Sequence, residues 1–174
     1  MDKEFWRAKS MADFTQEEWD SICLKCGKCC AYKAIDANRH VNFYNRVCDG
    51  LDMTTGLCKR YENRLCEECL KVDLKMLCKK PHLLPEDCAY RMLKEKGCLP
   101  EYHPLITGDD ESVKKAKQTV LDWEDIHSIA DIREATNAVL KKANEEEWSM
   151  EQFEDAVSEA VKKFALRIVK SYKM

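Results

Sequence analysis

The sequence has little glycine, little proline and no long apolar run. Of its 174 residues, 5 are Gly and 4 are Pro, so we expect no flexible linker, collagen-like tract or low-complexity segment. Apolar runs extend over only a few residues, which excludes a membrane-spanning segment and a membrane partner. Residues 1–10 lack the apolar core of a secretory signal peptide. We therefore expect a cytoplasmic protein.

An excess of charge of one sign is also absent. The chain has 29 basic and 32 acidic side chains, and its net charge is −3. This balance excludes binding to nucleic acid through bulk electrostatics, so we expect no nucleic-acid partner. Signatures of common enzymes are missing as well: there is no GxGxxG, no phosphate loop and no nucleophile elbow. We therefore expect no catalytic residue, and a non-enzymatic role is favoured.

Cysteine, in contrast, is abundant. The chain contains 11 cysteines, and nothing in it points to the oxidising compartments in which disulfides persist. Because the cytosol keeps thiols reduced, ligation of a metal or a cluster explains this number best. Inert buried thiols are the alternative, but they would not explain why the cysteines cluster in the sequence.

The cysteines are densest in the segment Cys23-Leu-Lys-Cys26-Gly-Lys-Cys29-Cys30. Two-residue spacing brings sulfur atoms to the same side of a tight turn, and Gly27 allows such a turn. Two of these steps in succession match the ligand triplet of 4Fe–4S ferredoxins. Because neighbouring side chains point apart, we expect Cys29 and Cys30 to serve different metals or different edges of one cluster.

Chain length and local patterns predict an α+β fold for a body of about 128 residues. A chain of 174 residues suits one domain with an appendage. A capping-box pattern at Thr15 and Glu18 predicts a short helix over residues 15–24. Alternating residues 32–35 and 41–44 predict a β-hairpin. We expect a small cysteine-rich body of short helices and a β-hairpin, organised by metal.

Two further helices are predicted before the tail. Leucines at i, i+4 and i+7 predict a helix from residue 65 that Pro81 ends. The next helix is expected to have Pro85 in its first turn and to end before Gly97. Residues 98–107 are expected to be irregular.

The composition changes in the tail, since residues 131–174 contain no Cys, Gly or Pro. Two apolar stripes at helical spacing and a capping-box pattern at Ser149 predict an α-helical hairpin joined near Glu147. We therefore divide the chain into a cysteine-cluster metal-binding domain, residues 1–128, and a C-terminal α-helical hairpin extension, residues 129–174. We expect the extension to be separable and to offer an apolar face to the body or to a protein partner. The second stripe consists of Phe153, Val157, Val161, Phe164 and Ile168.

The CxxCxxCC segment resembles the signature of the YcgN/YkgJ-type cysteine-cluster proteins, a bacterial family described as a zinc- or iron-chelating domain. The resemblance covers roughly residues 3–127 and is specific. It extends to Cys58-Lys-Arg-Tyr61-Glu-Asn-Arg64, Cys88-Ala-Tyr-Arg91 and His103-Pro-Leu105. The helical hairpin lies outside it. The resemblance implies chelation of a metal.

The cysteine pattern of that family also implies which thiols act as ligands. It omits Cys66, Cys78 and Cys98. The eight positions that fit it are Cys23, Cys26, Cys29, Cys30, Cys48, Cys58, Cys69 and Cys88.

Eight thiolates suit two four-sulfur sites or one larger cluster. The tandem spacing favours an iron–sulfur cluster, and Zn²⁺ is the alternative. The pairs Cys23/Cys26 and Cys66/Cys69 resemble a four-cysteine zinc site, but the gap between them far exceeds that of ordinary zinc ribbons. Ligation by sulfur alone disfavours magnesium and calcium.

Basic side chains accompany the cysteines. Lys25, Lys28 and Lys33 interleave with the cysteine segment, and we expect their charge to offset that of the thiolates. His103 is a candidate ligand or a donor to a ligand, although an ordinary polar role is favoured.

Three functions remain open at this point. The first is a metal-binding cysteine-cluster protein whose partner is the metal ion or cluster. The second is a metal-dependent or redox enzyme that modifies proteins, which an open coordination position beside a pocket would favour. The third is an interaction module in which zinc only stabilises the fold and the helical hairpin binds a protein.

Overall fold

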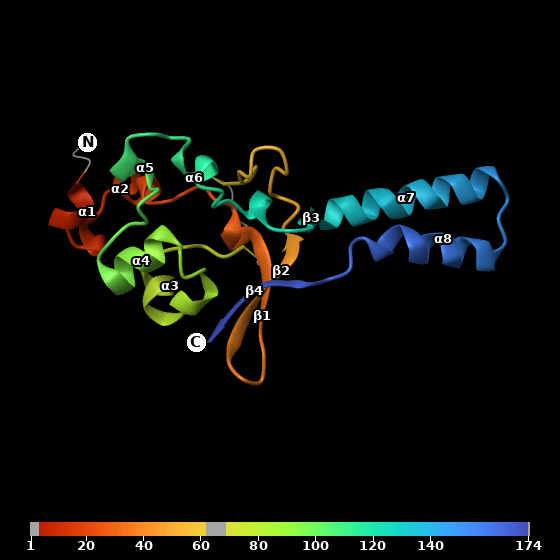
Figure 1. Ribbon diagram of the computed structural model, residues 1–174, viewed down its shortest axis with the longest axis horizontal. Coiled ribbons are helices and arrows are strands. Elements are labelled where there is room, and N and C mark those ends of the chain that lie inside the picture. The colour runs from red at the N-terminus through yellow and green to blue at the C-terminus, as the bar shows by residue number, and fades with distance from the viewer. Residues whose placement is uncertain (1–3, 62–68, 174) are drawn as a thin grey trace.

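Short helices gather on one side of a small mixed sheet, and a helical hairpin projects away from the other side (Figure 1). The computed structural model describes residues 4–61 and 69–173. The fold is α+β, as predicted. The helices of the body are α1 (Phe5–Ala8), α2 (Gln16–Ser21), α3 (Leu74–Lys79), α4 (Ala89–Lys96), α5 (Pro104–Thr107) and α6 (Ser112–Lys115), with 3-10 turns η1 (Met11–Asp13), η2 (Lys28–Cys30), η3 (Pro81–Leu83) and η4 (Val120–Asp122).

The predicted capping box begins helix α2. The Thr15 hydroxyl accepts a hydrogen bond from the Glu18 N–H at 3.2 Å, and the Glu18 carboxylate accepts the Thr15 N–H at 2.9 Å. These bonds satisfy two amides that have no partner within the helix. The helix ends at Ser21, earlier than residue 24, because the chain then turns into the cysteine segment.

Helix α3 is shorter than the leucine spacing predicted. It begins only at Leu74, because the Asp73 carboxylate accepts the Met76 N–H at 2.7 Å and caps the helix there. Residues 69–73 are not helical, and the rest of the predicted segment lies outside the described residues.

Helix α4 also begins late, since Cys88 is its N-cap and Pro85 precedes it in a turn. Gly97 ends it in the left-handed conformation with φ 66°, as predicted. Within residues 98–107, which were expected to be irregular, Pro104 and the His103 cap begin the short helix α5.

Strand β2 (His40–Val47) is the centre of a four-stranded sheet. The predicted hairpin is confirmed, because β1 (Ala31–Ile35) pairs antiparallel with β2. Along its other edge, β2 pairs in parallel with β3 (His127–Ser128) and antiparallel with β4 (Ile168–Lys173). No sequence pattern predicted β4, and the helical position predicted for Ile168 is wrong. Tyr44 and Ile168 are instead partners across the β2–β4 ladder.

The C-terminal helical hairpin is confirmed. It consists of α7 (Ile129–Glu145) and α8 (Met150–Lys162), which pack against each other and extend away from the body (Figure 1). The predicted capping box of α8 is present, since the Ser149 hydroxyl accepts the Gln152 N–H at 3.3 Å. Neither helix contains a buried residue, so the hairpin is stabilised by its own interface and by its two ends.

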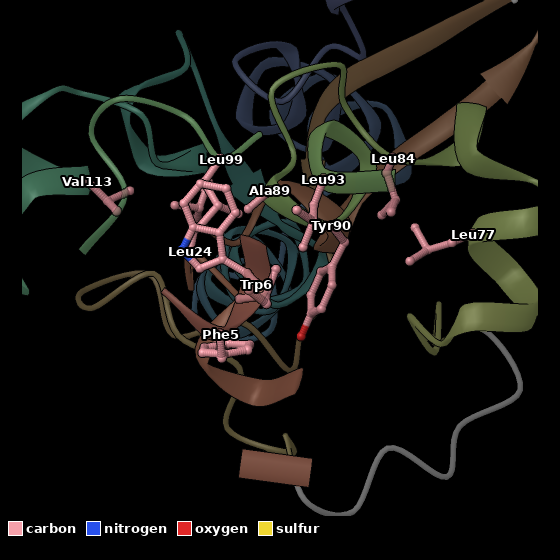
Figure 2. Packing of buried hydrophobic residues seen from close by; sticks show 11 residues of the cluster. Phe5, Trp6, Leu24, Leu77, Leu84, Ala89, Tyr90, Leu93, Leu99 and Val113 are labelled. Carbon is pink, nitrogen blue, oxygen red and sulfur yellow. The ribbon is translucent and has the colours of Figure 1, made fainter. Parts of the chain in front are cut away.

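Two clusters of buried apolar residues form the core. In Figure 2, Leu77 of α3 and Leu84 lie at one end of the first cluster, and Val113 of α6 lies at the other. The second cluster combines residues of β1 and β2, such as Phe43, with Val120 of η4. Cysteines divide between them: Cys30 packs against the second cluster, whereas the first is contacted by Cys23, Cys26, Cys29 and Cys88.

Asn45 of β2 joins the sheet to both ends of the hairpin. Its side chain is fully buried. Its amide donates to the carbonyl oxygens of Asp125 and Ala165, both at 3.2 Å, and its carbonyl accepts the Arg167 N–H at 2.8 Å. Because Asp125 precedes α7 and Ala165 follows α8, one side chain fixes where the hairpin leaves the body and where it returns.

In the part of the chain that the structure describes, no helix has both the length and the apolar composition needed to cross a bilayer.

Asn45→Leu is expected to lower the free energy of unfolding by about 2–3 kcal/mol, because three backbone groups lose their partners and leucine offers none. Urea denaturation of the full chain measures the loss. Asn137→Leu, at an exposed position of α7, is the control and should change stability by less than about 0.5 kcal/mol. Equal effects of the two substitutions would show that Asn45 does not anchor the hairpin.

Candidate metal centre

One cavity of about 1270 Å³ collects the cysteines that the sequence singled out. Typical small-molecule pockets measure roughly 300–1,000 Å³, so this space exceeds the needs of one ion. Among the described residues, Cys78 and Cys98 do not line it, and Cys66 lies outside them. All eight predicted ligands line the cavity: Cys23, Cys26, Cys29, Cys30, Cys48, Cys58, Cys69 and Cys88.

The cysteine segment follows α2 as a tight, curled loop. Lys25 and Gly27 adopt positive φ angles of 52° and 71°, which reverse the chain direction between the sulfurs. Gly27 has no room for a side chain, since a Cβ there would lie 2.8 Å from a Val120 methyl group and 2.9 Å from the Gly56 carbonyl oxygen. The loop is also fixed from outside, because the Val120 N–H donates to the Cys26 carbonyl at 2.7 Å. The glycine that the sequence predicted for this turn is therefore required by space as well as by φ.

Four thiols form a first group beside the first apolar cluster: Cys23, Cys26, Cys29 and Cys88. Burial raises the pKa of Cys26, and the neighbouring Cys29 and Cys88 raise it further. Burial raises the pKa of Cys88 to about 12, although the backbone amides of Arg91 and Tyr90 favour its thiolate. Each thiol therefore lies within electrostatic reach of others in the group.

A second group contains Cys30, Cys48 and Cys58. The Cys48 N–H donates to the Cys30 carbonyl at 3.0 Å, and Cys58 forms an isolated β-bridge with Leu51. A hydrogen bond with Cys29 raises the pKa of Cys30 most, followed by burial and then by the charges of Cys29, Cys58 and Cys48. The two groups meet at the adjacent Cys29 and Cys30, which pack against different apolar clusters. Because their side chains are hydrogen-bonded to each other, they do not point apart, which corrects the expectation from the sequence.

Cys69 lines the same cavity from a different segment. It opens the described stretch that leads to α3, and the following Leu70 and Val72 pack against the first apolar cluster. The eight thiols thus converge from five separate parts of the chain.

The three lysines of the cysteine segment have different environments. Lys33 lies beside Cys29 and Cys30, and its Nζ donates to the Cys29 carbonyl at 2.9 Å; burial lowers the pKa of Lys33, and the two cysteines oppose that effect. Lys25 is exposed. Lys28 is 4% exposed and forms an ion pair with Asp87. Its charge is therefore directed at a carboxylate, which corrects the expectation that it offsets the thiolates.

The Lys28–Asp87 pair links the cysteine segment to the segment that carries Cys88. The Lys28 Nζ lies 2.5 Å from Asp87 Oδ2 and 3.0 Å from Gln118 Oε1. Lys28 precedes Cys29, and Asp87 precedes Cys88, so the pair holds two thiols of the first group on adjacent segments. Sequence reasoning missed this pair, because no local pattern indicates a contact between residues so far apart in the chain.

His103 is engaged in structural hydrogen bonds. It is fully buried, its Nδ1 accepts the Leu105 N–H at 3.0 Å, and its Nε2 lies 3.1 Å from the Ile22 carbonyl oxygen. These contacts assign the proton to Nε2, which donates to Ile22. Burial lowers the pKa of His103. Both ring nitrogens are used, so the structure gives His103 the ordinary polar role and no free nitrogen for a metal.

The donor set fits a soft metal. Zinc and iron–sulfur clusters select thiolates, and thiols with raised pKa values become thiolates only when a bound cation compensates the charge. Across residues 4–61 and 69–173, no group of three or more His, Cys, Asp or Glu side chains is already arranged around a point where an ion would lie. Binding of a metal ion would therefore require the sulfur atoms to move towards one another, since a zinc–sulfur bond is about 2.3 Å long.

Comparison with known proteins finds bacterial relatives called UPF0260 proteins. The chain is 41% identical over 138 residues to the one from Vibrio vulnificus, a match that covers 72% of this chain and 94% of the relative. It is 42% identical over 125 residues to the one from Rhizorhabdus wittichii, and this match covers 70% of this chain and 85% of the relative. It is 40% identical over 139 residues to the one from Haemophilus influenzae, a match that covers 71% of this chain and 91% of the relative. No family model and no solved structure matches the chain.

Gly27→Ala is expected to lower the free energy of unfolding by about 2–4 kcal/mol, because it combines an unfavourable φ with overpacking against Val120. Gly108→Ala is the matched control: its φ is also positive at 70°, but nothing lies within 4 Å of the added Cβ, so only about 1 kcal/mol should be lost. Urea denaturation of the metal-free protein compares them. If both variants lose the same stability, the cysteine loop is less tightly packed than described.

His103→Gln tests the structural histidine through pH. In the unfolded chain His103 has an ordinary pKa of about 6.5, and in the folded protein its pKa is lower. The unfolded state therefore binds more protons below pH 6.5, and the metal-free wild type should lose stability as the pH falls towards 5.

The glutamine variant cannot titrate at this position and should lose less stability over the same interval, by on the order of 1 kcal/mol. Denaturation curves at several pH values measure the difference. Parallel pH profiles for the two proteins would mean that His103 takes up its proton as easily in the folded state as in the unfolded state.

Proposed function

The chain belongs to the UPF0260 family, and we propose that it is a cytoplasmic protein that binds an iron–sulfur cluster or zinc through clustered thiolates. The observation that carries the proposal is the convergence of eight cysteines on one cavity, while Cys78 and Cys98 lie elsewhere. The resemblance to the cysteine-cluster proteins selected the same eight residues, and the CxxCxxCC spacing independently pointed to four of them. A chance selection from ten described cysteines would not be expected to separate these two from the rest.

The iron–sulfur cluster is the first choice of metal group. Two successive CxxC steps match the ferredoxin triplet, and their sulfurs at Cys23, Cys26 and Cys29 join Cys88 in the first group. Four thiols from two segments suit one cluster. The second group of three thiols and Cys69 would provide four more. Zinc is the alternative, because four thiolates also satisfy its tetrahedral preference.

A second candidate function is catalytic. The cavity is larger than a closed four-sulfur site requires, and charged side chains such as Lys33, Arg60 and Asp20 line it. A redox or Lewis-acid centre with substrate space beside it would fit this shape. The third candidate, a zinc-stabilised interaction module, is supported by apolar side chains that the hairpin leaves exposed, such as Met150 at 71%.

Metal content decides the proposal. The protein purified without oxygen is expected to be brown and to contain iron and inorganic sulfide. Zinc without iron would show that the iron–sulfur assignment is wrong, while the proposal that the cysteines bind a metal would stand. Absence of any bound metal, both as purified and after incubation with iron, sulfide or Zn²⁺, would overturn the proposal.

Single Cys→Ser variants test the ligand set, because a hydroxyl is a poor ligand for soft metals. Each substitution at the eight cavity positions should lower the metal content and the melting temperature together, since metal-binding free energy is also folding free energy. Cys78→Ser and Cys98→Ser are the matched controls. They should retain full metal content and lose about 1 kcal/mol of stability at most. Full metal content in the Cys29 and Cys30 variants, or equal losses at all positions, would contradict the assignment.

A further inference from the structure

The C-terminal strand β4 returns to the body next to the segment that carries Cys88. After α8 the chain crosses back to the sheet (Figure 1), and β4 pairs with β2 from His40 to Tyr44. Side chains of β4 then reach beyond the sheet to residues 84–87, directly before Cys88. A segment that lies outside the cysteine-rich body in the sequence therefore contacts the candidate metal centre.

Tyr172 makes the first of these contacts. Its hydroxyl donates to the Leu84 carbonyl at 2.7 Å, and Arg91 Nη1 donates to the same oxygen at 2.9 Å. The Arg91 guanidinium lies 5.4 Å from the centre of the Tyr172 ring, and the Phe43 ring lies 5.5 Å from it on the sheet side. Tyr172 thereby joins β2, the turn at Leu84 and helix α4.

Lys170 makes the second contact. Its Nζ lies 3.5 Å from Asp87 Oδ2, the same oxygen that pairs with Lys28. One carboxylate therefore joins three segments: the cysteine loop, the segment before Cys88, and the C-terminal strand.

The other end of the hairpin is also fixed beside a cysteine. The Ala130 N–H at the start of α7 donates to Asp49 Oδ1 at 2.9 Å, and Asp49 follows Cys48. The start of the extension thus contacts the neighbour of Cys48, in the second group of thiols, and its end contacts the neighbour of Cys88, in the first group.

We propose that Lys170 and Tyr172 are positioning residues for Cys88, acting through Asp87 and Leu84. Seating of β4 and occupancy of the thiol cavity are then thermodynamically linked, so each favours the other. This inference rests on the proposed function. It also replaces the expectation that the extension is separable, because β4 supplies part of the framework of the site.

The test uses the full-length double variant Lys170→Met/Tyr172→Phe, which keeps the length of one side chain and the ring of the other. Lys173→Met, at the exposed end of the same strand, is the matched control. Zn²⁺ is the probe: each protein is loaded with Zn²⁺ and challenged with EDTA. The double variant should release Zn²⁺ about five- to tenfold faster than wild type, given the hydrogen bond and the ion pair removed, and Lys173→Met should match wild type.

Two further measurements report on position and linkage. In the metal-free double variant, alkylation by iodoacetamide followed by mass spectrometry should be faster at Cys88 and unchanged at Cys58, which a general loss of stability would not produce. In the wild type, amide hydrogens of β4 should exchange more slowly when Zn²⁺ is bound, as reciprocity requires.

The possible failures are distinguishable. If the wild type binds Zn²⁺ but the double variant releases it at the wild-type rate, with equal Cys88 alkylation, the positioning role is wrong and the proposed function stands. Equal acceleration of alkylation at Cys88 and Cys58 would also overturn the positioning role. If the wild type takes up neither Zn²⁺ nor an iron–sulfur cluster, the proposed function fails and the linkage fails with it.

Discussion

The ion pair between the buried Lys28 and the partly buried Asp87 is the contact on which the rest of the site depends. Lys28 lies inside the cysteine loop, and Asp87 lies next to Cys88, so the pair holds two distant segments together. An ammonium that is 4% exposed needs a partner, because a buried charge without a counter-charge is strongly destabilising. Gln118 completes its hydrogen bonds from a third segment. The loop cannot shift without separating these charges.

Features that depend on near neighbours could be predicted from the sequence. The capping boxes at Thr15 and Ser149 and the β1–β2 hairpin need only a few adjacent residues, and all are present. Strand β4 was missed because its partner β2 lies far away in the chain, while Ile168 happens to continue a helical spacing. The same reason applies to the site: the CxxCxxCC spacing pointed to four of the thiols and the family resemblance to the other four, whereas the Lys28–Asp87 pair has no local signature.

The matched relatives cover only part of this chain. A match covering 72% of this chain accounts for 94% of the relative from Vibrio vulnificus, so about 49 residues here have no counterpart in that alignment. The extension over residues 129–174 has nearly this length. It ends in a strand that covers the edge of β2, and an open edge would otherwise present unpaired backbone groups. The extension therefore also closes the sheet.

The hairpin is an arm that joins the body at one end, and that end would serve as its pivot. Helix α7 has 17 residues, so the arm is about 25 Å long at 1.5 Å per residue. Asn45 fixes both chain segments at the pivot, and Asp49 accepts the Ala130 N–H at the start of α7 there. A rotation of about 10° at the pivot displaces the tip by about 4 Å. Any rearrangement beside Cys48 that turned the base of the hairpin would therefore be geometrically amplified at the far end of the molecule.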